Sequence, residues 1–225
     1  MNLDEDILKI FCSDIKYKSI SSTSQEPLVK EFLKYNDLNN VFANSSSSYD
    51  LANTLRSFDF WFSKRSEEPK YFPVKEGSIY YLDLGAYNLK YETGFIHSCI
   101  ILKQWSTMVL VIPGSSKKYK KNNFLIEDVK AGDGFRENTG VLIDQSRFVS
   151  ITRIRGKVLG EIKPETLKRI KDKYLNITLP DLHKSYAEIQ NENNTLKGEI
   201  AIKEEEIEAL KKQLQEISEK NQNQD

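Results

Sequence analysis

Apolar residues in the first third of the chain recur at steps of three and four residues, the period of an amphipathic helix. They form three groups: Ile7, Leu8, Ile10, Phe11 and Ile15; then Leu28, Val29, Phe32 and Leu33; then Leu51, Leu55, Phe58 and Phe62. Acidic Asp4 and Asp6 precede the first group, Pro27 opens the second, and the polar run 45–48 offers an N-cap for the third. The pattern predicts a helical region over residues 1–70.

The third predicted helix carries four aromatic side chains close together. They are Phe58, Phe60, Trp61 and Phe62. We interpret this cluster as part of a core rather than as a platform on which nucleic-acid bases stack.

The pattern changes over residues 71–178, where short apolar runs alternate with Gly, Asn and Asp. The runs are 79–82, 99–102, 108–112, 124–126 and 141–143. Their length, β-branched content and punctuation favour strands, and five or more short strands predict a small β-barrel or sandwich. Pro164 then opens a helix with Leu167, Ile170 and Tyr174 on one face, which we expect to pack on the barrel.

A heptad pattern follows over residues 182–220, before a polar tail at 221–225. With Leu182 at position d, the a and d positions are Tyr186, Ile189, Asn193, Leu196, Ile200, Lys203, Ile207, Leu210, Leu214 and Ile217. Only Asn193 and Lys203 among them are polar, and the repeat exceeds the three to four heptads that indicate a coiled coil. Three interpretations of this segment remain open. It is a coiled coil that self-associates, a helix folded back on the rest of the protein, or a helix that binds another partner.

Composition narrows the class of protein. The 225 residues contain 33 Lys plus Arg and 33 Asp plus Glu, which argues against a polycation and against an acidic disordered protein. Residues 182–225 carry a net charge of −4, so residues 1–181 carry +4 and RNA binding by the body is open. Cys12 and Cys99 lack metal or redox spacing, and neither a secretory signal nor a membrane span is evident. We therefore expect a soluble, cytoplasmic protein that does not associate with membranes.

The search for established catalytic motifs is negative. The chain has no phosphate-binding loop, dinucleotide fingerprint, zinc-protease motif or nucleophile elbow. His97 and His183 are its only histidines, too few for a multi-histidine metal site, and we expect no cofactor. His183 starts the heptad region, whereas His97 precedes an apolar strand, where it is either a buried histidine or a functional one.

The predicted strands, in order, resemble the MazF/PemK toxins over residues 77–175. The matching segments are Gly77–Leu84, the Glu92–Gly94 turn, Val109–Ser116, Gly140–Arg147, Arg155–Ile162 and Pro164–Leu167. The resemblance implies an α+β fold with a small SH3-like barrel that forms homodimers and cleaves single-stranded RNA without metal, leaving a cyclic phosphate. It also implies an antitoxin protein that occupies the RNA groove.

The resemblance also implies which residues carry the chemistry. The family's arginine of an Arg-Pro pair corresponds to His97, its proline to Ser98 and its threonine to Ser115. Histidine can act as an acid or a base but lacks the permanent charge of arginine, while serine keeps the hydroxyl. We expect Glu92 to orient His97.

Positively charged residues that could bind RNA phosphates follow Ser115 directly in the sequence. The predicted RNA-binding residues are Lys117, Lys118, Tyr119, Lys120, Lys121 and Arg147. Lysines bind phosphate and a tyrosine ring can stack on a base. The leading hypothesis is a toxin-like endoribonuclease; the alternative is an inactive barrel that binds RNA or protein and is oligomerised by its coil.

Overall fold

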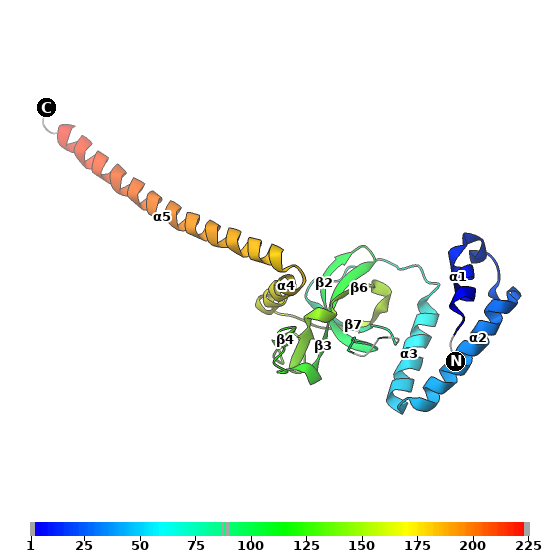
Figure 1. Ribbon diagram of the computed structural model, residues 1–225. Helices are drawn as coiled ribbons and strands as arrows, with labels where there is room; N and C mark the ends of the chain where they lie inside the picture. Colours follow the sequence, from blue (N-terminus) through cyan, green and yellow to red (C-terminus); the bar gives the residue numbers. More distant parts are fainter. Residues whose placement is uncertain (1–2, 87, 89–90, 223–225) are drawn as a thin grey trace. The chain divides into compact units, whose positions relative to one another are not determined.

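The computed structural model describes residues 3–86, 88 and 91–222, with side chains as far as Leu214. Contacts divide the chain into a helical unit, residues 1–67 with 85–90, and a sheet unit, residues 68–84 with 91–225. Figure 1 shows the helices and strands of both units. The side chain of Ile217 and residues 223–225 of the predicted tail lie outside the described part.

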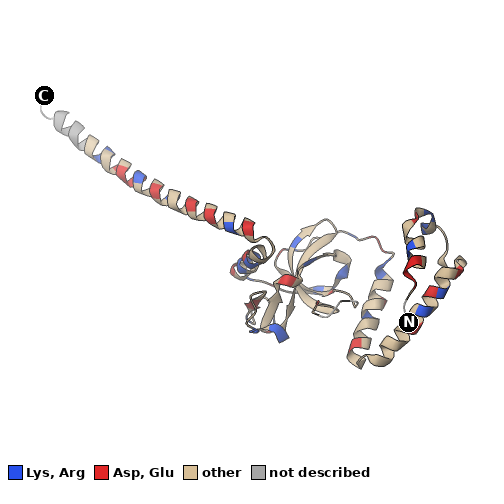
Figure 2. Cartoon of the chain, viewed as in Figure 1, with Lys and Arg blue, Asp and Glu red and all other residues tan. Residues whose placement is uncertain are grey.

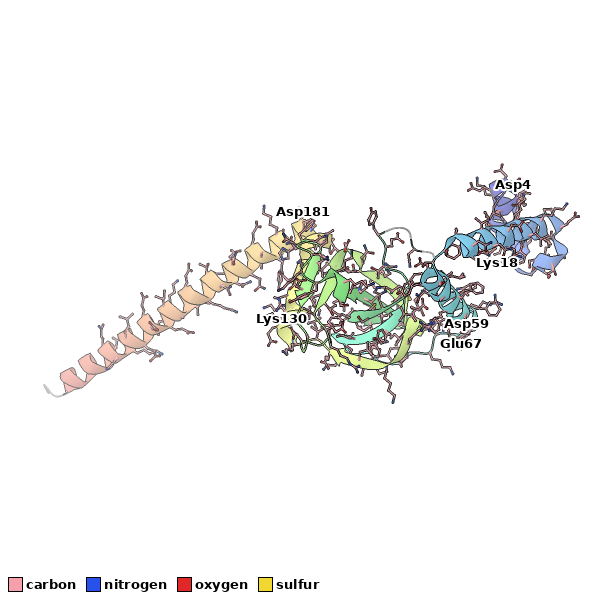
Figure 3. The ribbon with its side chains drawn as sticks, turned by 90° about the horizontal axis from the view of Figure 1, so that it is seen from below. Asp4, Lys18, Asp59, Glu67, Lys130 and Asp181 are labelled. Atoms are coloured by element: carbon pink, nitrogen blue, oxygen red, sulfur yellow. The ribbon has the colours of Figure 1, made fainter. Side chains whose placement is uncertain are left out.

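The helical unit contains the three helices that the sequence predicts. They are α1 (Glu5–Ser13), α2 (Glu26–Ser45) and α3 (Ser48–Lys64). The side chain of Asp4, labelled in Figure 3, accepts hydrogen bonds from the backbone N–H groups of Asp6 and Ile7, which makes it the N-cap of α1. Pro27 lies in the first turn of α2, and Ser47 caps α3 by accepting from the N–H of Asp50. These helix starts are confirmed.

The aromatic cluster of α3 does not form the predicted core. Phe58, Trp61 and Phe62 are 45%, 52% and 51% exposed, and the residues of α3 that are buried are Thr54 and Ser57. The aromatic rings instead pack against one another on the surface: the Phe58 and Phe62 centroids are 6.1 Å apart. The prediction failed because helical periodicity identifies an apolar stripe but does not say what covers it.

The sheet unit is built on antiparallel strands. They are β1 (Ser78–Asp83), β2 (Ile96–Trp105), β3 (Met108–Ser115), β4 (Ile126–Val129), β5 (Thr139–Leu142), β6 (Arg147–Ser150) and β7 (Ile154–Glu161). The order in the sheet is β4-β5-β3-β2-β1-β7, and β6 pairs with β3. Strand β6 is absent from the apolar runs of the sequence because it is short and bears polar residues.

Both faces of the central strands are buried. Along β2, Ile100 and Leu102 belong to one apolar cluster, whereas Cys99 and Ile101 belong to a second cluster on the opposite face. Alternating side chains of a strand point to opposite faces, so a continuous apolar run is what a strand covered on both sides requires. We call the cluster containing Cys99 and Ile101 the inner cluster.

Helix α4 (Pro164–Thr178) covers the cluster that contains Ile100. Ile170 is fully buried in that cluster, and Leu167 and Tyr174 pack against it. The predicted packing of this helix on the sheet is therefore confirmed.

Close backbone contact links the two ends of the sheet. Gly134, in the loop after β4, lies against Gly160 of β7, and a Cβ atom on Gly160 would lie 2.3 Å from the carbonyl oxygen of Gly134. The sheet is thus curved enough to bring the β4–β5 loop onto its far edge. The fold is a mixed one of helices and a curved antiparallel sheet; an SH3-like barrel remains a prediction.

Helix α5 (Pro180–Gln222) contains the predicted heptads. Its side chains from Lys184 to Leu214 are all exposed, and Figure 3 shows them projecting along the helix that starts near Asp181. Within the described residues, no helix is sufficiently long and apolar to cross a membrane.

Candidate functional site

Strand pairing brings two of the three predicted catalytic residues, His97 and Ser115, to the same end of the sheet. In the β2–β3 ladder Ser98 lies opposite Gly114. The next position in this antiparallel register places His97 opposite Ser115, which stand at adjacent strand ends. Directly opposed residues have Cβ atoms about 5 Å apart and side chains on the same face. The structure therefore brings His97 and Ser115 together.

Arg147 shares the face of these two residues. His97 precedes the inner-cluster residue Cys99 by two positions, and Arg147 likewise precedes inner-cluster Val149 by two. Because side chains two positions apart point the same way, both project on the side of the inner cluster. Strand β6 places Arg147 opposite Val111 of β3, the strand that ends in Ser115. Three of the predicted site residues thus lie on one face.

Two long-range hydrogen bonds fix the loop that precedes β2. The Arg147 Nη2 atom donates to the carbonyl oxygen of Thr93 at 3.2 Å, and the N–H of Thr93 donates to Gln145 Oε1 at 3.1 Å. These bonds join positions more than 50 residues apart. Thr93 and Gln145 were not among the predicted site residues, although Asp144-Gln145 belongs to the motif that carries the family resemblance.

The environment of His97 lowers the pKa of its imidazole. The ring is half-buried, and its Nδ1 atom is buried with no hydrogen-bond partner in the part of the chain that the structure describes. Burial lowers the pKa of His97, a hydrogen bond with the backbone of Gly94 opposes this shift, and the charge of Arg147 lowers the pKa further. A lowered pKa favours the neutral form of the ring, and a neutral imidazole is the form that can act as a base.

Cys99 lies beside this site but does not contribute a nucleophile. It is fully buried, and burial raises the pKa of its thiol far above neutral pH. The thiolate is the reactive form of cysteine, so Cys99 acts as a small apolar core residue.

The lysine loop begins immediately after Ser115, with a short turn at Ser116–Lys118. All four lysines are exposed, namely Lys117, Lys118, Lys120 and Lys121. The loop is held in place by the N–H of Lys120, which donates to Asp128 Oδ1 at 3.0 Å. The Lys120 ammonium lies 5.7 Å from the ring centroid of half-buried Tyr119. The loop therefore offers accessible positive charge on a defined backbone, while base stacking on Tyr119 remains a prediction.

Glu92 lies in the loop tied down by Thr93 and is exposed. That it orients His97 remains a prediction. Arg153 and Arg155, which also add positive charge to this region, bind a buried acid. The Nη1 atom of Arg153 donates to the carbonyl oxygen of Asp83 at 3.0 Å, and Arg155 Nη2 lies 3.2 Å from Asp83 Oδ2. These two arginines hold β7 to the end of β1.

A surface hollow lies elsewhere, at the β3–β4 loop. Residues 121–124, 126–128 and Lys173 line it, so Lys121 is the one predicted site residue among them. Within the described residues, no group of three or more His, Cys, Asp or Glu side chains could hold a metal ion.

The part of the chain that contains this site is similar to a known family. Residues 75–177 match the model of the PemK-like, MazF-like toxins of type II toxin–antitoxin systems. This segment is PemK/MazF-like. The PemK/MazF-like segment runs from just before β1 to the end of α4, so it contains His97, Ser115, Arg147 and the lysine loop. Helices α1–α3 and α5 lie outside it.

Solved structures of MazF proteins resemble the same part of the chain. MazF from Deinococcus radiodurans has 18% identity and a TM-score of 0.41, covering 48% of this chain and 97% of that one. A MazE–MazF complex from the same organism has 18% identity and a TM-score of 0.37, covering 48% and 96%. An endoribonuclease from a Mycobacterial species has 16% identity and a TM-score of 0.37, covering 48% and 93%. The comparison with curated proteins found no match. The likeness to this family thus rests on the match of residues 75–177.

Proposed function

We propose that the PemK/MazF-like segment is an endoribonuclease that cleaves single-stranded RNA without a metal ion. The observation that carries this proposal is that His97, Ser115 and Arg147 lie on one face of the sheet. His97 and Ser115 lie near the adjacent ends of β2 and β3, and Arg147 pairs with Val111 of β3. Cleavage of this kind needs a base for the 2′-hydroxyl proton and charge stabilisation at phosphorus. The three side chains offer a neutral imidazole, a hydroxyl and a guanidinium.

In this proposal the neutral imidazole of His97 takes the proton of the 2′-hydroxyl. The 2′-oxygen attacks the adjacent phosphorus, the bond from phosphorus to the 5′-oxygen breaks, and solvent supplies a proton to that departing oxygen. The products are a 2′,3′-cyclic phosphate and a 5′-hydroxyl end. Ser115 donates its hydroxyl hydrogen bond to the phosphate, and Glu92 orients His97.

In this sequence His97 stands where the family has an arginine, so a permanent positive charge is lost there. In this proposal Arg147 supplies that charge. Its guanidinium is near enough to His97 to lower that residue's pKa. It also retains donor capacity beyond its bonds to the carbonyl oxygens of Thr93 and Gln145, because a guanidinium carries five N–H groups. We therefore assign Arg147 to the phosphate, in the role that a permanently charged side chain fills best.

The lysine loop is expected to supply most of the salt-dependent RNA affinity. Each lysine that neutralises a phosphate on a single strand contributes about 0.7 to the slope of log affinity against log salt. Replacing Lys117, Lys118, Lys120 and Lys121 together by alanine should lower that slope by roughly 0.7 for each lost contact. Fluorescence anisotropy with a labelled single-stranded RNA at several salt concentrations measures it. Lys184→Ala, an exposed lysine on α5, is the control; an equal fall there would contradict a role specific to the loop.

Around this activity we propose the wider setting that the family suggests. Residues 71–178 form the catalytic domain, residues 1–70 a separate helical domain, and the protein works in the cytoplasm as a homodimer with an antitoxin protein as its inhibitor. The alternative function is an inactive domain that binds RNA or protein. It is favoured by the loss of the Arg-Pro pair, since His97-Ser98 stand in its place.

The test uses the full chain and a mixed-sequence single-stranded RNA in the presence of EDTA. Sequencing of the products should show cuts at a recurring short sequence, with cyclic phosphate ends. The Ser115→Ala/Arg147→Gln double variant, prepared identically, should not make these cuts. If the wild-type protein cuts no more than this variant while still binding the RNA, the alternative replaces the proposal.

A further inference from the structure

Helix α5 carries an apolar seam that no described residue covers. The exposures of its a and d residues are 59% for Leu182, 56% for Tyr186, 54% for Ile189, 48% for Leu196, 55% for Ile200, 50% for Ile207, 58% for Leu210 and 67% for Leu214. A seam of this length on one helix is stable in water only when another helix packs against it. Charge and side-chain shape along α5 identify that helix.

We propose that α5 pairs with α5 of a second copy as a parallel, in-register, two-stranded coiled coil. The first argument is the shape of the seam residues. In the centre of the described helix, β-branched Ile200 and Ile207 occupy position a, and Leu196 and Leu210 occupy position d. β-Branched residues at a with leucine at d favour two parallel strands.

The second argument is the charge beside the seam. In a parallel pair, a residue at position g faces position e of the next heptad in the partner. Glu192 then faces the partner's Lys197, and Glu206 faces the partner's Lys211. Twofold symmetry doubles each ion pair. Figure 2 shows acidic and basic residues distributed along this helix.

Asn193 fixes the register in which the two α5 helices pair. In the parallel arrangement it lies at position a opposite the partner's Asn193, where two amides can bond to each other across the seam. Within the single helix its Nδ2 atom donates to the carbonyl oxygen of Ile189 at 3.1 Å. The amide oxygen and the second N–H are thus available to the partner.

An antiparallel pair is the competing arrangement. One antiparallel register places Asn193 opposite the partner's Lys203 and matches every other described seam residue with an apolar one. It also brings three like-charged pairs together, with no attractive pair in exchange. They are Glu199 with the partner's Glu199, Glu192 with the partner's Glu206, and Lys197 with the partner's Lys197. The parallel pair has two repulsive combinations, Glu199 with the partner's Glu204 beside the seam and Lys203 with the partner's Lys203 within it. Against them stand two attractive combinations, each of which occurs twice. Charge therefore favours the parallel pair.

The parallel orientation has a consequence for the rest of the molecule. Both copies of α5 begin at the same end, directly after α4, so two PemK/MazF-like segments are tethered at that end. A tether raises the concentration of one site near the other, so an RNA bound by one copy is captured more readily by the second. The inference concerns assembly and stands whether or not the protein cleaves RNA.

Disulfide trapping tests the orientation in the full chain, with exposed Cys12 replaced by serine. Lys203→Cys places a thiol opposite itself in the parallel pair. In the antiparallel register, the same thiol lies opposite Asn193 of the partner. Those two positions are ten residues apart along one helix, about 15 Å, which is too far for a disulfide in the parallel pair.

The expected result is rapid oxidation of Lys203→Cys alone to a covalent dimer. The same variant mixed with Asn193→Cys should give no mixed dimer. A mixed dimer without the homodimer would overturn the parallel orientation. Sedimentation equilibrium of the unmodified protein should give a dimer; a monomer or a trimer would overturn the proposal.

Charge variants provide the second measurement. Glu192→Lys should raise the dimer dissociation constant roughly tenfold, because two attractive pairs become repulsive. Adding Lys197→Glu in the same chain should restore dimerisation. Glu205→Lys, at the outward position f, makes the same charge change away from the seam and should leave the constant unchanged. The assigned ion pairs would be contradicted if Glu192→Lys and Glu205→Lys weakened dimerisation equally. They would also be contradicted if adding Lys197→Glu to Glu192→Lys did not restore dimerisation.

Discussion

Replacing His97 by alanine is expected to slow RNA cleavage by a factor of about 100 to 10,000, the usual contribution of a positioned acid or base. The alanine removes the only imidazole on the face shared by Ser115 and Arg147. RNA affinity should change little, because phosphate binding is assigned to the lysine loop and Arg147. Single-turnover cleavage of a labelled RNA, measured together with its affinity, separates the two effects.

His183→Ala is the matched control, since His183 is the other histidine of the chain. Its Nε2 atom lies 2.9 Å from Asp172 Oδ1 on α4, away from the strand ends that carry the site. Cleavage should stay at the wild-type rate. If His97→Ala retains full activity, or if both variants lose it equally, His97 is not the base.

The pH dependence of cleavage follows from the same residue. As the base, His97 works only when neutral, so the rate falls as the pH drops through its pKa. Burial and Arg147 place that pKa below the ordinary value for histidine, so activity should persist to lower pH than a solvent-exposed histidine would allow. Arg147→Gln removes one cause of the lowered pKa and should move the acidic limb to higher pH. If the acidic limb of the pH–rate profile does not move in Arg147→Gln, then Arg147 does not lower the pKa of His97.

Replacing Gly160 by alanine is expected to lower the free energy of unfolding of the sheet unit by about 1–3 kcal/mol, the usual cost of overpacking. The added Cβ would lie 2.3 Å from the carbonyl oxygen of Gly134, which is backbone and cannot rotate away. Gly160 is also paired with Ile79 of β1, so relief of the clash must distort either the ladder or the β4–β5 loop. Urea denaturation followed by near-ultraviolet circular dichroism measures the loss.

Two other glycines separate crowding from backbone conformation. Gly156 has a φ of +76° but nothing within 4 Å of its Cβ position, so Gly156→Ala tests the cost of the left-handed backbone alone. Gly198 lies in the exposed helix α5, and nothing lies within 4 Å of its Cβ position. Gly198→Ala should therefore stabilise the helix, because alanine has a higher helix propensity than glycine. If Gly160→Ala is no more destabilising than Gly156→Ala, the close approach of the loop to β7 does not limit stability.

Helix starts and central strands could be predicted because their causes are local. Asp4 and Ser47 cap the helices that follow them, and Pro27 lies in the first turn of α2. The apolar runs at 99–102 and 108–112 became β2 and β3 because only strands buried on both faces accommodate such runs. Strand β6 could not be predicted, since its four residues owe their conformation to pairing with β3.

The site was predictable in part. Residue order alone places His97 and Ser115 at the ends of consecutive strands, and antiparallel pairing then makes them neighbours. Arg147 stood out as a charged residue after a strand, but its position beside His97 depends on the β3–β6 ladder. The bonds from Thr93 to Gln145 and Arg147 span more than 50 residues, and no local pattern specifies them.

By itself, the sequence determined where α1 to α4 begin and where the central strands form, that residues 182–220 carry a heptad pattern, and that a PemK/MazF-like segment is present. These properties depend on short-range periodicity and on residue types in order. Only the tertiary structure decided that Phe58, Trp61 and Phe62 of α3 are exposed, that Gly134 meets Gly160, and that burial beside Arg147 lowers the pKa of His97. Each of these depends on surfaces that come together from distant parts of the chain, where the burial, packing and electrostatic field at one residue are set by others.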